Sequence, residues 1–181
     1  QRRDIVRGQA TLGPDEFLNN IPGVYVQNRY NFSQGQRIEI RGAGARANFG
    51  IRGIKVLLDG IPQTLPDGQS QVTNVEWGLL ERADVLRGAA SAIYGNATGG
   101  VVAYQTISAG PEGFTQRVRL QAGSFGSSKW QAISTARAGD FSGVFSVSRF
   151  QWDGFRQQSA ADQRLLNLAT TWAPSERTQL D

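Results

Sequence analysis

The chain has 181 residues, 22 of them glycine, and contains neither cysteine nor histidine. These absences exclude thiol nucleophiles, disulfides, Cys/His zinc sites and an imidazole base, which removes most ordinary enzyme mechanisms. The formal net charge is +4, but the basic residues are dispersed and only Arg2 and Arg3 are adjacent. Since nucleic-acid binders gather their positive charge in a patch, we expect no nucleic-acid partner.

The composition, 39% hydrophobic and 19% charged, falls in the range of globular proteins. No run approaches the roughly 20 apolar residues of a membrane-spanning helix. No charged segment followed by an apolar one opens the chain, so we expect Gln1 to be a processed or trimmed start.

The first 110 residues mix short strands, turns and two brief helices. A helix is predicted from Pro14 to Leu18, because proline and acidic residues favour a helix start, and Pro22-Gly23 should end the segment. Alternation of isoleucine with charged residues predicts a half-buried strand over Arg37–Arg41.

Further strands are expected at Ile54–Asp59, Ala83–Arg87 and Val101–Thr106. A helix is expected over Ala89–Tyr94, with Gly95 as its C-cap. Together these elements predict a small mixed α/β domain.

Beyond the turn-rich segment Ser108–Gly113 the pattern changes. Strand-like segments of about 9 to 12 residues follow, a length that suits tilted transmembrane β-strands: Phe114–Ala122, Lys129–Ala138, Phe141–Trp152 and Arg164–Trp172. In the first, Gln116, Val118, Leu120 and Ala122 share one face, and Thr115, Arg117, Arg119 and Gln121 share the other. Aromatic residues near the strand ends suit an interfacial girdle: Trp130, Phe150, Trp152 and Trp172. Strands of a soluble antiparallel sheet are the alternative.

The stretch LLERADVLRGAASAIYGNATGGVV, residues 79–102, is the most informative part of the chain. Together with three upstream motifs, Ile21–Val24, Ile38–Gly42 and Val56–Pro62, it resembles the plug domain of TonB-dependent outer-membrane receptors. The matching positions are Glu81, Arg82, Val85, Leu86, Arg87, Gly88, Ser91, Tyr94, Gly95, Gly99, Gly100 and Val101. Asp84 and Ala89 stand where glutamate and proline are commoner.

The resemblance implies an α+β plug domain, a small mixed sheet with short helices, over residues 1–110. Residues 111–181 would then be the first four to five antiparallel strands of a partial transmembrane β-barrel. Barrels of this transporter class have about 22 strands, and a few strands cannot close, so we expect a fragment of a longer protein.

The implied function is energy-coupled uptake of a ferric siderophore or similar iron chelate by a monomeric receptor in the bacterial outer membrane. TonB and outer-membrane lipid would be its partners, with no cofactor and no enzymatic activity. Alternatives are a receptor for cobalamin, a carbohydrate or another metal complex, and a soluble periplasmic binding module. An enzyme would be left with carboxylate or Ser/Lys chemistry, for which no constellation is visible.

Arg41 and Arg87 occupy the Arg-Gly positions of two of the motifs. In the family, arginines there pair with glutamates on the barrel wall, and Glu81 is assigned to the same plug–barrel contacts. A buried guanidinium needs such a partner, because desolvating an unpaired charge costs several kcal/mol. Local pairing with Glu39, Glu81 or Asp84 is the alternative.

The family also implies that plug loops form the floor of the ligand site. The candidates are Arg29, Tyr30, Asn31, Arg46, Asn48, Phe49, Gln63, Thr64, Asp67 and Gln69. Arg29 and Arg46 would suit an anionic chelate, although ordinary surface exposure is the alternative for each residue.

Other motif residues are expected to be structural: Gly42, Asp59, Gly60, Gly88, Tyr94, Gly95, Gly99 and Gly100. Residues 42–47 superficially match a dinucleotide-binding fingerprint. Because residues 48–50 interrupt any helix there, we interpret the segment as a glycine-rich loop.

Overall fold

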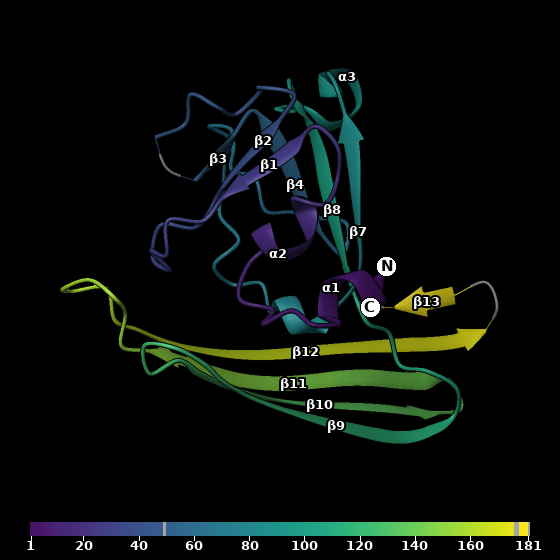
Figure 1. The fold of residues 1–181 in the computed structure, drawn as a ribbon. Helices are drawn as coiled ribbons and strands as arrows, with labels where there is room; N and C mark the ends of the chain where they lie inside the picture. The colour runs from purple at the N-terminus through teal and green to yellow at the C-terminus, as the bar shows by residue number, and fades with distance from the viewer. Residues whose placement is uncertain (49, 176–177, 181) are drawn as a thin grey trace. The chain divides into compact units, whose positions relative to one another are not determined.

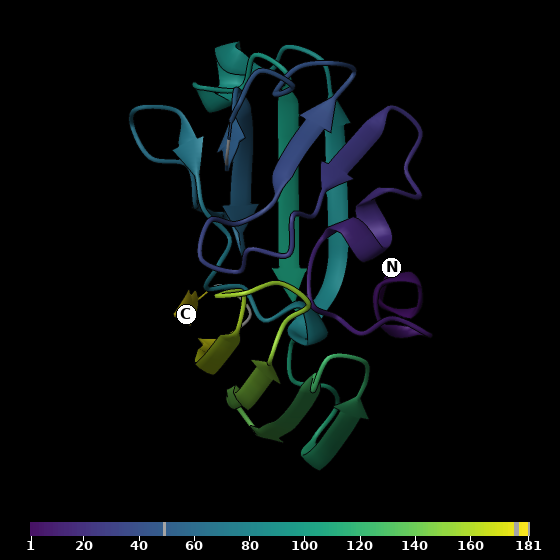
Figure 2. The same ribbon diagram turned by 60° about the vertical axis from the view of Figure 1, so that its left-hand side comes forward.

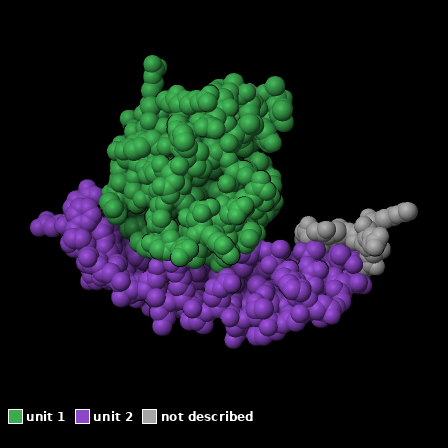
Figure 3. All heavy atoms as spheres, turned by 45° about the vertical axis from the view of Figure 1, so that its right-hand side comes forward, with its two compact units in different colours: residues 1–106 green, residues 107–181 purple. Residues whose placement is uncertain are grey.

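The computed structural model describes residues 1–48, 50–175 and 178–180 (Figure 1). The chain forms two compact units, residues 1–106 and 107–181, coloured separately in Figure 3. The boundary expected from the sequence, between residues 110 and 111, lies a few residues past this division.

Unit 1 is built on a four-stranded mixed sheet with the order β5-β4-β8-β7 (Figure 2). Its strands are β4 (Ile54–Leu58), β5 (Ile61–Pro62), β7 (Leu80–Arg87) and β8 (Gly100–Thr106). β8 is parallel to β4 and antiparallel to β7. The inner position of β8 explains its consecutive apolar residues, since an inner strand covered on both faces does not alternate.

Two smaller sheets accompany this one in unit 1. β1 (Val24–Gln27) pairs with β2 (Arg37–Ile40), and β3 (Ile51–Arg52) pairs with β6 (Gln69–Ser70), both antiparallel. The helices are short: α1 (Arg2–Val6), α2 (Asp15–Leu18), the 3-10 helix η1 (Trp77–Leu79) and α3 (Ser91–Tyr94). None of the helices in the described ranges is long and apolar enough to span a membrane.

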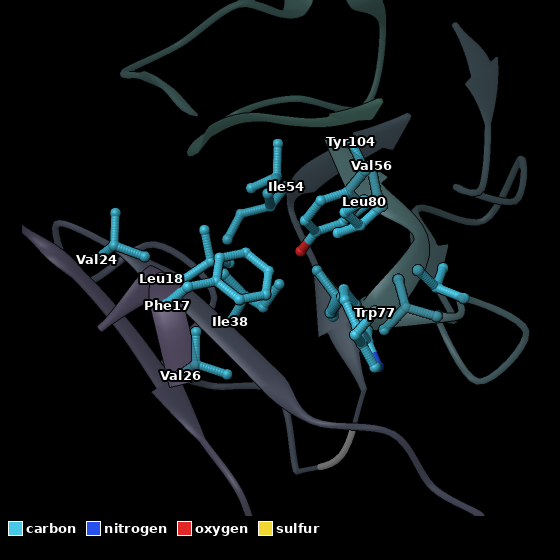
Figure 4. Close-up of a cluster of buried hydrophobic side chains, with 14 of the residues drawn as sticks. Phe17, Leu18, Val24, Val26, Ile38, Ile54, Val56, Trp77, Leu80 and Tyr104 are labelled. Atoms are coloured by element: carbon cyan, nitrogen blue, oxygen red, sulfur yellow. The ribbon is translucent and has the colours of Figure 1, made fainter. Parts of the chain in front are cut away.

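The core of unit 1 gathers side chains from α2, β1, β2, η1 and the main sheet (Figure 4). Tyr104 of β8 is fully buried and meets Trp77 edge-on at a centroid distance of 5.3 Å, with Phe17 at 6.4 Å. Such edge contacts are favourable for aromatic rings. Burial raises the pKa of Tyr104, so its hydroxyl stays protonated.

Two adjacent glycines allow β8 to enter the sheet. Gly100 has φ +141°, and a Cβ placed on it would collide with the carbonyl oxygen of Leu86 on β7. A Cβ on Gly99 would collide with the side chain of Ala43. A side chain at either position would therefore force neighbouring chain segments apart.

Unit 2 is an antiparallel meander with the order β13-β12-β11-β10-β9. Its strands are β9 (Gly113–Ala122), β10 (Ser128–Ala138), β11 (Phe141–Trp152), β12 (Ala161–Ser175) and β13 (Thr178–Leu180). Only residues 139 and 140 separate β10 from β11, whereas residues 123–127 and 153–160 form the longer connections at the opposite end.

The two faces of this sheet differ in chemistry. One face, which we call the apolar face, presents exposed hydrophobic residues from four strands: Phe114, Val118, Leu120, Trp130, Phe141, Phe145, Leu166, Leu168 and Trp172. The opposite face, the polar face, carries buried Lys129, Gln131, Ser146 and Ser148 together with some apolar residues. Strict alternation along each strand produces this division.

The prediction for the strand-end aromatics is partly wrong. Trp130 and Trp172 lie on the apolar face, as a girdle requires, but Phe150 and Trp152 are buried on the polar face. Side chains of successive residues in a strand point to opposite faces, so residues 150 and 152 of β11 face away from Phe141 and Phe145. Phe141, which was not assigned to the girdle, stacks on Trp172 at 5.7 Å.

All the helices and strands expected from the sequence are present, several with shifted ends. β7 and β12 begin three residues earlier than expected, and α3 begins two residues later. Not expected were α1, η1 and the short strands β1, β3, β5 and β6. These pieces are too short to show a period in sequence.

The close approach at Gly100 yields a prediction. We expect Gly100→Ala to destabilise the full-length protein by about 2 kcal/mol or more, because it combines a backbone clash with an unfavourable φ. Gly110→Ala is the matched control, since Gly110 has open space around it and no positive φ. Thermal unfolding of both variants tests this, and equal midpoints would contradict it.

The hydroxyl of Tyr104 yields a second prediction. It is buried and has no hydrogen-bond partner among the residues that the structure describes. Because an unsatisfied buried hydroxyl costs about 1–3 kcal/mol, we expect Tyr104→Phe to unfold at the same temperature or higher. A clear loss of stability, compared with the exposed control Tyr25→Phe, would show that the hydroxyl has a partner in the full-length protein.

Candidate functional site

The two arginines predicted to form plug–barrel contacts both lie at one turn of unit 1. Arg87, at the end of β7, donates from Nη1 to the carbonyl oxygen of Pro22 at 2.8 Å. Arg41 donates its backbone N–H to the carbonyl oxygen of Gly23 at 2.8 Å, and its Cγ lies 3.5 Å from the position of a Cβ built on Gly23. Two exposed guanidinium side chains thus flank the Pro22-Gly23 turn.

The nearby carboxylates are paired with other arginines. Glu39 binds Arg37 at 2.6 Å, and Asp84 binds Arg82 at 2.7 Å. Glu81 is exposed on β7. Among the described ion pairs none includes Arg41, Arg87 or Glu81. The local pairing considered from the sequence is therefore not the arrangement that the structure has.

The loop residues predicted for a ligand floor come from separate segments. Arg29, Tyr30 and Asn31 follow β1 and are exposed, and Tyr30 has φ +53°. Arg46 and Asn48 are exposed in the loop after β2, which Arg37 holds through a 3.3 Å hydrogen bond to the carbonyl of Ala47. Phe49 lies outside the described residues.

In the segment after β5, one prediction needs correction. Thr64 is buried, and its hydroxyl accepts from the backbone N–H of Val56 at 2.9 Å and bonds Ser70 at 2.6 Å. A threonine committed to the interior in this way does not face a ligand. It instead anchors the loop to β4, a role that threonine hydroxyls commonly take.

The neighbours of Thr64 remain accessible. Asp67 is exposed and accepts hydrogen bonds from the backbone and side chain of Gln69, at 3.0 and 2.8 Å. Gln63 is half-buried and accepts from Asn74 at 3.2 Å. These contacts order the loop and leave its polar side chains at the surface.

The motif residues expected to be structural occupy special backbone positions. Asp59 has φ +51°, and its carboxylate accepts from the backbone N–H and hydroxyl of Thr106, at 2.7 and 2.9 Å, which ties the end of β4 to the end of β8. Positive φ values occur at Gly42, Gly60, Gly88, Gly95 and Gly100. Tyr94 is exposed at the end of α3.

Sequence reasoning missed a contact that attaches the first helix. Arg2 of α1 donates to the carbonyl oxygens of Leu80 at 2.7 Å and Gly78 at 3.3 Å. Ile5 of the same helix is buried. A five-residue helix is too short to be stable alone, so this fork and the buried isoleucine hold it in place.

An aromatic cluster at the ends of the unit 2 strands was also missed. Phe155 lies 5.7 Å from Phe125 and 5.5 Å from Trp152, and the guanidinium of Arg156 lies 4.8 Å above its ring. Phe125 and Phe155 come from two connections separated in sequence, and Trp152 ends β11, so no local pattern predicts their contact.

Comparison with known proteins identifies the class. The family model for the TonB-dependent receptor plug domain matches residues 1–101. The chain belongs to this family, and its mixed sheet with short helices followed by antiparallel strands agrees with the fold expected from the four motifs.

Individual relatives are receptors and transporters. The hemin receptor of Yersinia pestis is 31% identical over 143 residues, which is 78% of this chain but 19% of that protein. The copper transporter OprC has a TM-score of 0.70 at 19% identity, over 91% of this chain and 26% of its own. The siderophore receptor PirA from Acinetobacter baumannii has a TM-score of 0.69 at 18% identity, over 98% and 29%.

The plug-domain match shows the family, and the two solved structures show the fold. The chain spans about a fifth of the length of the hemin receptor it matches and under a third of both solved structures. The named ligands of the three proteins differ, although their folds are similar to that of this chain.

Proposed function

We propose that this chain is the plug and the first barrel strands of a TonB-dependent receptor of the bacterial outer membrane, which imports an iron chelate. The observation that carries the proposal is one continuous chain in which a plug-domain match is followed by strands with an exposed apolar face. A plug needs a barrel around it, and an apolar strand face suits lipid.

Arg41 and Arg87, which flank the Pro22-Gly23 turn, supply the positive charge that holds the plug in this proposal. Two cations beside one turn repel each other unless anions neutralise them. In the proposed receptor Arg41 and Arg87 pair with glutamates of the barrel wall, while Glu81 meets a basic residue there. Guanidinium suits this role because its fork binds carboxylate in a bidentate manner.

The proposed ligand is an anionic iron chelate, with a ferric siderophore as the first candidate. Supporting residues are the exposed arginines and asparagines of the plug loops: Arg29, Asn31, Arg46 and Asn48. Hemin is the second candidate, favoured by the 31% identity to a hemin receptor. Its propionates are carboxylates and could be bound by the same arginines.

Transport in this proposal involves no covalent chemistry. Ligand contact at the loops would favour a plug state in which the N-terminal side is accessible to TonB, so the two faces of one domain are coupled. The receptor would act as a monomer surrounded by outer-membrane lipid.

A strain that lacks the gene tests the substrate. We expect it to grow poorly when a ferric siderophore or hemin is the only iron source, and the gene should restore growth. Normal use of every iron source, together with loss of a vitamin or sugar, would overturn the iron assignment.

The loop arginines provide the residue-level test of the ligand site. We expect Arg29→Gln combined with Arg46→Gln to weaken binding of the ferric chelate by about a hundredfold or more, since each of the two charge-assisted contacts contributes on the order of 1.5–3 kcal/mol. Arg52→Gln is the matched control, because Arg52 is exposed on β3 in the same unit. Binding is measured by fluorescence quenching of the purified full-length receptor.

The plug–barrel contacts provide a separate test. In the full-length receptor, Arg41→Gln combined with Arg87→Gln should leave barrel glutamates unpaired at a cost of about 3–5 kcal/mol. We expect a lower unfolding temperature of the plug and increased entry of large antibiotics, with Arg52→Gln unchanged. Unaltered stability and permeability would falsify the pairing while leaving the ligand assignment intact.

A further inference from the structure

We propose that the apolar face of unit 2 carries a binding site for a phosphate-bearing glycolipid of the outer leaflet, formed by Arg149 and Arg164 beside Trp130. The proposal rests on the outer-membrane placement proposed above. It goes beyond that function, because the site takes no part in binding or moving the imported ligand.

The hydrocarbon-contacting part of this face is a series of cross-strand rows. Val118, Ala132, Val147 and Leu166 lie opposite one another on β9, β10, β11 and β12, and Gln116, Ser134, Phe145 and Leu168 form the next row. Leu166 and Leu168 have 69% and 68% of their surface exposed. Leucine side chains this accessible on an ordered strand suit acyl chains.

The row on the other side of Val118 and Leu166 changes from apolar to charged. Leu120 and Trp130 are followed in register by Arg149 and Arg164. Arg149 binds Asp162 through two bonds, at 3.1 and 2.7 Å, and Arg164 approaches the same carboxylate at 3.4 and 3.3 Å. Charges on a lipid-facing strand are costly at mid-membrane, so this row marks the edge of the apolar band.

The height of the band agrees with this edge. From Phe141, stacked on Trp172 at one end, to Arg149 is eight residues of β11. This corresponds to about 26 Å along the strand and roughly 20 Å of height at a tilt of about 40°, close to the ~25 Å apolar band of such proteins.

Loop lengths indicate which leaflet the charged row meets. The two-residue turn at 139–140 lies beside Phe141, whereas the longer connections, 123–127 and 153–160, lie at the end that holds the charged row. Outer-membrane barrels have short periplasmic turns and longer extracellular loops. The charged row therefore meets the outer leaflet, whose glycolipid carries phosphate groups.

Charge balance favours a phosphate as the additional partner. Two guanidiniums share one carboxylate, so the cluster keeps one positive charge. Asp162 is held chiefly by Arg149, and the side chain of Arg164 is 71% exposed, with its shorter contact at 3.3 Å. Arg164 thus has N–H donors directed at solvent, and guanidinium matches phosphate geometry.

The test measures glycolipid bound to the purified full-length receptor. Native mass spectrometry should show retained lipid A in the parent protein and about tenfold less in the double variant Arg149→Gln, Arg164→Gln. The double variant Arg117→Gln, Arg119→Gln is the control, because it removes the same two charges from the polar face of β9. Equal retention in the two variants overturns the proposal.

A second variant separates a lipid site from a purely structural ion cluster. Asp162→Asn removes the competing carboxylate and raises the local charge, so a phosphate site predicts stronger retention of lipid A. A cluster that only stabilises the strands predicts no gain. The gain should disappear with dephosphorylated lipid A, and equal binding of both lipids, or preferential binding of phosphatidylglycerol vesicles, contradicts the assignment.

Uptake assays keep this result apart from the proposed function. We expect the Arg149, Arg164 double variant to bind and import the ferric chelate normally and to reach the outer membrane at normal yield. If the receptor proves to import a ligand other than an iron chelate, the expected retention of lipid A stays the same. A parent receptor that fractionates outside the outer membrane would overturn both.

Discussion

The close approach of β8 to its neighbours determines how unit 1 is built. Gly100 lets β8 pass the carbonyl of Leu86, and parallel pairing with β4 then places Val102 and Tyr104 inside the core. Asp59 secures the far ends of β4 and β8 through Thr106. Motif residues that look unrelated in sequence therefore act at the two ends of one pair of strands.

Strands and motifs could be predicted because their causes are local. Ile38 and Ile40 alternate with charged residues, and strand length in residues 114–172 follows from turn-forming clusters. The short pieces α1, η1 and β3 could not be predicted, since contacts distant in sequence hold them, such as those of Arg2 with Gly78 and Leu80. The aromatic girdle was misjudged at Phe150 and Trp152 because closeness to a strand end does not determine the face.

For the candidate site, the sequence identified residues but not their contacts or their burial. The motifs singled out Arg41 and Arg87, but their meeting at Pro22-Gly23 depends on three segments of the chain. Thr64 was chosen because the family resemblance makes the plug loops the floor of the ligand site, but the structure buries it, and its hydroxyl accepts from the N–H of Val56. Burial of one hydroxyl is decided by tertiary packing, which loop composition does not report.

The family resemblance and the surface chemistry answer different questions about the ligand. Proteins of this fold include a copper transporter and a siderophore receptor, so the fold alone selects no substrate. Selection must come from exposed groups, and the plug loops offer guanidiniums at Arg29 and Arg46 with amides at Asn31 and Asn48. Such groups recognise the negative charge and oxygen atoms of an organic shell. On the proposed function, the plug therefore recognises the chelator, and the metal enters as its cargo.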